Sequence, residues 1–284
     1  MNSSVGYDVF EKVVEAAGGI PVLLKQVKNS VIKYDSNGQV VGEEIETSGA
    51  LKQSFADKIK NKNYAETNVE NVLDGIDGVF MIGGEDISST LFKVPEKVAN
   101  AGEKLDAARD ISDYIIMAYC MDNDIPIISV CRGMQIMGIV AGSGYIQEIR
   151  DYYEANNSDY TNDIHRALLA TNGERYVRHD VELVGRNSHM YEIVGADILK
   201  SVSSWHHQAV GSLDGTELVQ TARTIYNGVE ITEAIEHPGK KFCVGVQFHP
   251  ENEVKLVLCD KQNTPADYDI ALRFFKKLVE CANF

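Results

Sequence analysis

The chain has 284 residues and a net charge of −15, and 44% of its residues are hydrophobic. This length and composition predict a single large α/β domain over residues 1–284. The acidic balance argues against a nucleic-acid or anionic-membrane surface, because phosphates would be repelled at long range. No apolar run approaches the length of a membrane span. Five scattered cysteines without C-x-x-C spacing favour a reducing cytoplasm, with no disulfide framework or zinc site.

Hydrophobic spacing predicts short elements in the first part of the chain: a helix over 7–17, a strand over 20–24, a hairpin around Asn37-Gly38, an amphipathic helix through Leu51, Phe55 and Ile59, and a buried strand over 79–82. The last strand runs into Gly83-Gly84. Two glycines after a parallel strand allow a turn with exposed backbone N–H groups, which can form an oxyanion site. From these residues alone, an ordinary βα turn is the better explanation of the two glycines. A long helix is expected over 105–121.

The chain is organised around Pro126–Gln135. Residues 127–130 form an apolar run typical of a strand buried on both faces of a parallel sheet, and the apolar spacing that follows predicts a helix over 132–140. Cys131 therefore lies where a strand turns abruptly into a helix, which is the geometry of a nucleophile elbow. The helix N-terminus would favour a thiolate there. The alternative is a small buried cysteine in a packed core.

Residues 143–176 are polar and rich in tyrosine, and we expect a loop region beside the site. Short strands are then predicted over 181–184, 198–203, 217–223, 229–236 and 242–247, and a final helix over 270–279. The adjacent His206 and His207 interrupt these strands. Because side chains at i and i+1 diverge on a strand, we expect a substrate wall or a hydrogen-bonded corner there rather than a metal site.

The segment His249-Pro250-Glu251 follows the last predicted strand. The proline favours extended geometry at His249 and argues against a helix. Since residues i and i+2 of an extended segment face the same way, Glu251 can bond one imidazole nitrogen and leave the other for a thiol. A histidine oriented in this way activates a cysteine nucleophile. A surface turn is the alternative.

Together these stretches resemble the class I glutamine amidotransferase superfamily, and within it the gamma-glutamyl hydrolase branch of the gamma-glutamyl-GABA hydrolase type. The matching pieces follow the family order from about residue 6 to the C-terminus: Ala17–Val22, Ile76–Gly78, Gly83–Asp86, Arg109-Asp110, Cys131–Gln135, Ser204–Val210 and Gly245–Glu251. The elbow and the His-Pro-Glu segment, taken as a pair, are highly specific for this superfamily. The His-His-Gln sequence points to this branch rather than to biosynthetic amidotransferase subunits.

The resemblance implies a flavodoxin-like three-layer α/β sandwich with a mainly parallel central sheet and a small added β segment. For the site it implies Cys131 as nucleophile, His249 as its base, Glu251 as the orienting carboxylate, backbone N–H groups of Gly84 and Arg132 as oxyanion donors, and Gln135 and His207 near the glutamyl group. It implies no metal and no organic cofactor.

Three features depart from the family pattern. The strand that usually precedes the helix over 7–17 has almost no counterpart, so it is expected to be missing or supplied otherwise. Residues 28–70 are longer than the usual connection. With 143–178 they are expected to be insertions that build the pocket for the amine half of the substrate. Ser129 replaces the usual elbow glycine, which is a mild change. Four tyrosines could line the pocket, or could cover a surface loop: Tyr145, Tyr152, Tyr153 and Tyr160.

The implied function is hydrolysis of the γ-glutamyl amide bond of a small compound, such as γ-glutamyl-GABA or a γ-glutamyl polyamine. The reaction would pass through a glutamyl thioester, release glutamate and belong to polyamine catabolism. The acidic chain favours a neutral or cationic leaving amine over a polyglutamate tail. Two alternatives stay open: a glutaminase subunit that delivers ammonia to a synthase partner, and a catalytically silent binding protein of the same fold. A cytoplasmic location is expected, and a homodimer is left open.

Overall fold

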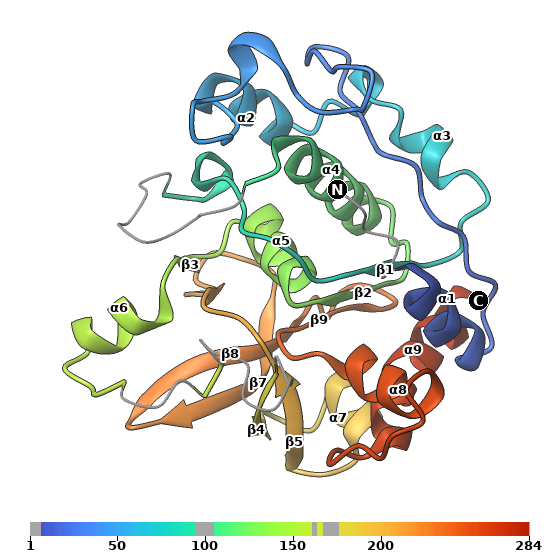
Figure 1. The fold of residues 1–284 in the computed structure, drawn as a ribbon, viewed down its shortest axis with the longest axis vertical. Helices are drawn as coiled ribbons and strands as arrows, with labels where there is room; N and C mark the ends of the chain where they lie inside the picture. Colours follow the sequence, from blue (N-terminus) through green and yellow to red (C-terminus); the bar gives the residue numbers. More distant parts are fainter. Residues whose placement is uncertain (1–6, 95–104, 161–163, 167–175, 284) are drawn as a thin grey trace.

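The computed structural model describes residues 7–94, 105–160, 164–166 and 176–283, and a seven-stranded sheet forms its centre (Figure 1). The strand order is β1 (Val79–Met81), β2 (Ile127–Val130), β9 (Cys243–Val246), β8 (Val229–Glu236), β7 (Val219–Tyr226), β4 (Val177–Leu183) and β5 (Ile198–Ser204). Strands β1, β2 and β9 pair in parallel, whereas the pairs from β9 to β5 are antiparallel. The sheet is therefore mixed, and its parallel part carries the predicted elbow strand.

Helices cover both faces of the parallel part (Figure 1). On one face lie α4 (Ala107–Asp122) and α5 (Arg132–Ala141), and on the other lie α1 (Tyr7–Ala16), α8 (Pro250–Leu258) and α9 (Tyr268–Ala282). Two clusters of buried apolar side chains fill the two interfaces, one including Ile111 and Met137 and the other including Phe248 and Phe274. Two helical layers around a sheet confirm the predicted α/β sandwich.

The antiparallel part of the sheet supports a smaller β unit. Strand β3 (Tyr145–Ile146) pairs antiparallel with β6 (Ala209–Val210) to form a separate two-stranded sheet. Helix α6 (Ile149–Ala155) follows β3, and α7 (His189–Val194) lies between β4 and β5. The region 143–176, expected to be a loop, thus contains a strand and a helix in its described part. The segments 161–163 and 167–175 lie outside the described residues.

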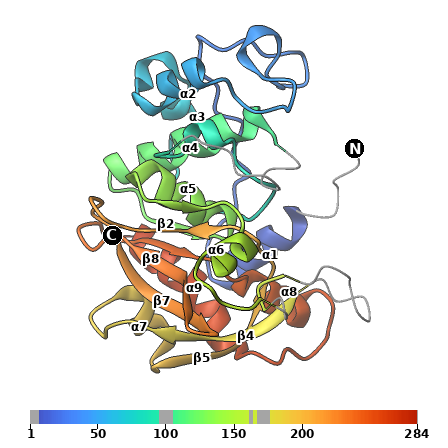
Figure 2. The same ribbon diagram turned by 90° about the vertical axis from the view of Figure 1, so that its left-hand side faces the viewer.

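The long segment 28–70 forms an extra layer on α4 (Figure 2). It contains the 3₁₀ turns η1 (Gly42–Glu44) and η2 (Tyr64–Glu66) and the helix α2 (Gln53–Lys60), with α3 (Val69–Leu73) at its end. The expected turn at Asn37-Gly38 is present, because Tyr34 and Val40 form an antiparallel bridge across it. A third 3₁₀ turn, η3 (Ser89–Leu91), packs against α2.

The strand predicted over 20–24 is wrong. These residues form no strand, and Ile20 is 89% exposed. Apolar residues alone do not make a strand without a neighbour to pair with, and Pro21 also removes one backbone donor. Among the described residues, no strand precedes β1, so the family's first strand has no counterpart there.

Candidate active site

Three neighbouring parallel strands end at one edge of the sheet, and a predicted site segment follows each of them. Gly83-Gly84 follows β1, Cys131 follows β2, and His249 comes three residues after β9. Ligands of open α/β sheets bind outside the carboxyl ends of the strands. The Cys131 N–H donates to the Val246 carbonyl at 2.7 Å, which ties the elbow to β9. The topology thus brings together segments that are far apart in the sequence.

Cys131 has the backbone strain expected of a nucleophile elbow. Its φ is +52° and its ψ is −109°, and α5 begins at the next residue. Such a conformation in a residue other than glycine costs about 1–3 kcal/mol and persists only where the surroundings impose it. Gly133 allows α5 to approach β1, since a Cβ there would lie 2.9 Å from the Met81 carbonyl oxygen. The serine at 129 fits as well, because its hydroxyl donates to the Val244 carbonyl at 3.2 Å.

His249 and Glu251 form a buried pair, with Nδ1 of the imidazole 2.7 Å from the Glu251 Oε1. The extended geometry predicted around Pro250 is wrong. Pro250 is the first residue of α8 and His249 is its N-cap. Proline is tolerated at that position because its missing N–H would have no partner inside the helix. The first helical turn, rather than a strand, therefore brings Glu251 to the imidazole.

The second nitrogen of His249 faces the cysteine. Glu251 occupies Nδ1, so Nε2 is the nitrogen left for the Cys131 sulfur, which acts on the same ring. A Cβ on Gly83 would lie 3.1 Å from the His249 Cε1 and 3.8 Å from the Cys131 Sγ, so the turn after β1 contacts both side chains. Burial lowers the pKa of His249, but the Glu251 carboxylate and then the Cys131 sulfur outweigh it and hold the pKa well above its usual value. A cationic imidazole beside the sulfur is the partner that a cysteine nucleophile requires.

Arg109 on α4 supports the turn after β1. Its Nη2 donates to the Gly83 carbonyl at 2.7 Å. A Cβ on Gly84 would lie 1.9 Å from the Arg109 Nη1, so only glycine allows the guanidinium to lie this close. The Gly84 N–H makes no hydrogen bond to a described residue. This N–H is therefore available to donate to an oxyanion.

The Arg132 side chain anchors the elbow to the same helix. It is 1% exposed, and its guanidinium lies 2.5 Å from Asp110 and 2.7 Å from Asp113. Asp113 also accepts from Arg109 at 3.3 Å, and Asp110 accepts from the Ser88 N–H at 3.0 Å. One pair of carboxylates on α4 thus holds both the elbow and the loop after β1. Arg109-Asp110 matches the family pattern without a predicted role, and Asp113 is not among the predicted site residues.

Gln135 and His207 lie in polar networks beside the elbow. Gln135 accepts from the Tyr145 hydroxyl at 3.0 Å and donates to the Gln208 carbonyl at 3.1 Å. His207 lies 2.9 Å from the carboxylates of both Asp86 and Glu148. Its burial lowers the pKa, but the two carboxylates outweigh burial and raise it to about 9, so His207 is cationic at neutral pH. Whether either residue contacts a glutamyl group stays a prediction.

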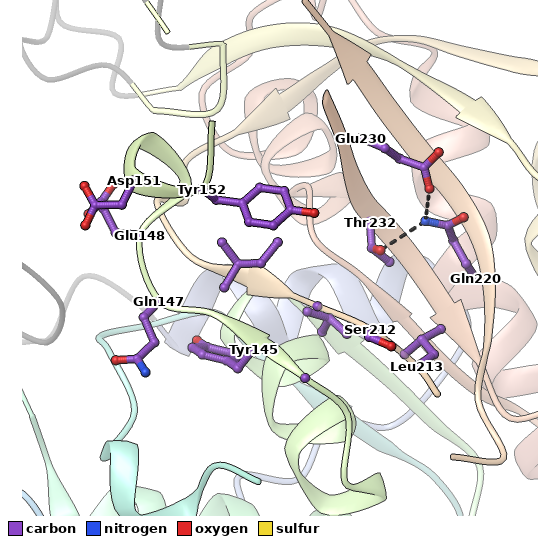
Figure 3. Close-up of a pocket in the computed structure, with 14 residues that line it drawn as sticks. Tyr145, Gln147, Glu148, Asp151, Tyr152, Ser212, Leu213, Gln220, Glu230 and Thr232 are labelled. Carbon is purple, nitrogen blue, oxygen red and sulfur yellow. Dashed lines mark hydrogen bonds between the residues drawn. The ribbon is translucent and has the colours of Figure 1, made fainter. Parts of the chain in front are cut away.

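An open groove of about 780 Å³ lies beside these networks, lined by residues of β3, β6, β7, β8 and the start of α6 (Figure 3). Tyr145 and Tyr152 line it, and Tyr145 connects it to Gln135. Cys131 and the segment 28–70 contribute no lining residue. Tyr153 and Tyr160 are buried and pack against each other instead, with ring centroids 4.7 Å apart. Of the four predicted tyrosines, two therefore lie at the groove and two in a core cluster.

An α/β sandwich with a cysteine elbow at the carboxyl edge of its parallel strands is the architecture of the class I glutamine amidotransferase superfamily. The sequence model of the Peptidase C26 family matches residues 59–251, and the chain belongs to this family. The family predicted from the sequence motifs is thereby confirmed at the level of the superfamily, and an enzyme of the hydrolase or amidotransferase kind is supported.

Individual relatives agree with this assignment. A glutamine amidotransferase-like protein of Rickettsia prowazekii is 25% identical over 252 residues, which cover 78% of this chain and 82% of that protein. Protein NtpR of Enterococcus hirae is 28% identical over 181 residues, 63% of this chain and 68% of that protein. The glutaminase domain of Trypanosoma brucei CTPS, solved with bound acivicin, has a TM-score of 0.50 at 18% identity. That comparison covers 98% of this chain and 90% of the domain, and it supports the fold.

No helix among the described residues is long and apolar enough to cross a bilayer.

Proposed function

We propose that the chain is a cysteine-dependent hydrolase that cleaves the γ-glutamyl amide bond of a small γ-glutamyl compound. The observation that carries this proposal is the strained Cys131 on the elbow, next to an imidazole that Glu251 orients. A structural cysteine needs neither the positive φ nor the cationic neighbour, whereas a nucleophile benefits from both. Membership of the Peptidase C26 family supports the same class of chemistry.

In the proposed reaction the Cys131 thiolate attacks the γ-carbonyl carbon, and the carbonyl oxygen becomes an oxyanion. The N–H groups of Gly84 and Arg132 would stabilise it, since Arg132 is the first residue of α5 and its N–H has no acceptor within the helix. Losing one such donor typically costs about 2.7–4 kcal/mol of barrier. The His249 imidazolium then protonates the departing amine, and the C–N bond breaks to leave a glutamyl thioester. Neutral His249 next takes a proton from water, whose oxygen attacks the thioester, and glutamate and the thiolate are released.

The substrate can be identified by measuring kcat/KM on γ-glutamyl-GABA, γ-glutamyl-putrescine, folyl-diglutamate and free glutamine, with glutamate quantified by mass spectrometry. We expect turnover of the two small γ-glutamyl amides and none by the Cys131→Ala variant. Cys259→Ala is the matched control, because Cys259 is partly exposed at the end of α8 and should leave the rate unchanged. Preference for the folyl compound would overturn the substrate class, and activity of Cys131→Ala would overturn the mechanism.

A glutaminase that passes ammonia to a synthase partner is the second candidate. The similarity in fold to a glutaminase domain over 98% of this chain favours it. Ammonia release from glutamine that appears only when a synthase is added, together with inert γ-glutamyl amides, would support this candidate. A catalytically silent binding protein would turn over neither class of substrate, with or without a partner.

A further inference from the structure

Three of the chain's seven histidines meet a buried carboxylate outside the candidate active site. His165 comes from the connection between α6 and β4, and His179 from β4 itself. His206 comes from the connection between β5 and β6, and Glu233 from β8. We call these four residues the His-Glu cluster. Its members come from four separate segments of the chain, so the fold, and no local motif, assembles it.

The donor atoms of the His-Glu cluster are spaced as metal ligands are. The Glu233 Oε1 lies 3.3 Å from His165 Nδ1, 3.7 Å from His179 Nε2 and 3.8 Å from His206 Nε2, and all four atoms lie within 4.8 Å of one another. Around a tetrahedral zinc ion with bonds of about 2.0–2.1 Å, neighbouring ligand atoms are about 3.3–3.4 Å apart. Small movements of side chains would therefore complete a tetrahedron.

Hydrogen bonds on the far side of two rings orient them towards the centre of the cluster. The His206 Nδ1 lies 2.9 Å from the Gln208 carbonyl oxygen, and the His179 Nδ1 lies 3.2 Å from the Asp180 carbonyl oxygen. A proton on each Nδ1 would satisfy these carbonyl oxygens, and the Thr224 hydroxyl also lies 3.2 Å from the His179 Nδ1, so both rings are held with Nε2 towards the cluster. A backbone acceptor on the far nitrogen is the usual support of a metal-bound histidine.

Burial makes the cluster costly without a cation. Glu233 is 0% exposed, and neither of its carboxylate oxygens makes a hydrogen bond to another described residue. The Nε2 atoms of His179 and His206 are also buried and make no hydrogen bond to another described residue. Among the described residues, the imidazoles of the cluster are what offsets the charge of this buried carboxylate, whereas a divalent cation would bind the carboxylate and the Nε2 atoms of His179 and His206 at once.

We propose that the His-Glu cluster binds one divalent transition-metal ion, zinc above all, as a closed structural site. Three imidazoles and a carboxylate suit zinc and its neighbours rather than Mg²⁺ or Ca²⁺, which prefer oxygen ligands. Four protein ligands fill a tetrahedron and leave no position for a reacting water. The proposal departs from the sequence expectation of no metal, and it does not depend on the proposed reaction.

The site would fasten residues 164–166 and the connection between β5 and β6 to the sheet. That connection continues into His207 and Gln208, and the Gln208 carbonyl is shared by His206 and Gln135. The ion would thus act on the active site only by holding this connection in place. Metal removal should accordingly lower thermal stability first.

The proposal is tested first on the unaltered chain. Protein purified in metal-free buffer should carry about one equivalent of zinc by plasma mass spectrometry, as for a closed four-ligand site. Treatment with a strong chelator should lower Tm, and adding zinc back should restore it. Cobalt added to the apo chain should give the visible d–d bands of tetrahedral coordination. Since the cluster contains no sulfur, the thiolate-to-cobalt band in the near ultraviolet should be absent, and a Cys131→Ala background excludes binding at the elbow.

Variants then locate the ion. Glu233→Gln and His206→Gln should each lose the bound metal and the cobalt bands. The matched control His189→Gln should retain both, because His189 lies on α7 and pairs with Glu192 instead. If a cluster variant fails to fold, the visible spectrum of the unaltered apo chain with added cobalt still tests whether the chain has a tetrahedral metal site. The proposal is overturned if that chain retains no metal, shows no cobalt bands and does not respond to zinc in Tm. It is also overturned if the two cluster variants bind metal as the control does.

Discussion

Replacing Arg132 by methionine should destabilise the fold far more than removing a surface charge. The guanidinium is 1% exposed and lies 2.5 Å from Asp110, which is itself fully buried. Removing one partner of a buried ion pair typically costs about 3–5 kcal/mol, because the other charge is left without compensation. The exposed pair of Arg186 with Asp197 is the matched control, and Arg186→Met should change the free energy of unfolding little.

The pH dependence of the stability lost in Arg132→Met is a sharper test. Burial raises the pKa of Asp110, and Arg132 opposes this shift, so the variant should raise that pKa further. A carboxyl group with a higher pKa in the folded than in the unfolded state favours folding while it is protonated. This advantage disappears as the pH rises from the unfolded value of about 4 through the folded value. Urea denaturation followed by circular dichroism at about pH 5 and about pH 8 should therefore show a larger loss at the higher pH. The reasoning would be refuted if Arg132→Met lost no more unfolding free energy than Arg186→Met. It would also be refuted if the loss were the same at both pH values.

Three further predictions concern the candidate site. Glu251→Gln should lower the pKa of His249, shift the alkaline limb of the kcat/KM profile to lower pH and reduce kcat by about 10²–10⁴-fold; an unchanged limb would contradict the pairing. Gly84→Ala should displace the Arg109 guanidinium and lower kcat by about 10²–10³-fold. Its far-ultraviolet circular dichroism spectrum should be unchanged, and full activity would show that the turn after β1 has no part in the mechanism. Iodoacetamide should label Cys131 faster than the other four thiols at neutral pH, as followed by peptide mass mapping, and faster labelling elsewhere would contradict an activated elbow.

The elbow was predictable because its pattern is local. The strand over 127–130 and the helix from 132 follow directly from a short run of apolar β-branched residues, interrupted only by Ser129, next to a helical pattern, and the structure places β2 and α5 there. The segment 20–24 shows the opposite case. Its residues have the composition of a strand, but strand formation needs a neighbour with free backbone groups, and composition does not reveal one.

Pro250 shows how one residue type supports two predictions. Its effect on His249 suggested an extended chain, yet the same ring is well suited to the first position of a helix, which is where it lies. The contact between His249 and Glu251 is present in spite of the wrong backbone, because His249 is the N-cap, outside the helix, and its ring lies against the first turn that carries Glu251.

Residues that act through distant partners had no signal in the sequence. His206 and His207 do point in different directions, as adjacent residues should, but the sequence could not show that one reaches Glu233 and the other Asp86. Asp113 on α4 is equally inconspicuous, since a carboxylate on a helix is usually solvated. Such roles depend on which segments the sheet places side by side.

The central claim is that Cys131 carries the glutamyl group during turnover. The most direct measurement is intact-protein and peptide mass spectrometry of the chain mixed with γ-glutamyl-GABA and quenched in acid within the first turnover. We predict an adduct with the mass of one glutamyl acyl group on the peptide that contains Cys131, which hydroxylamine removes, and no adduct in the Cys131→Ala variant. An adduct on a different residue, or glutamate release at full rate from the Cys131→Ala variant, would contradict the claim.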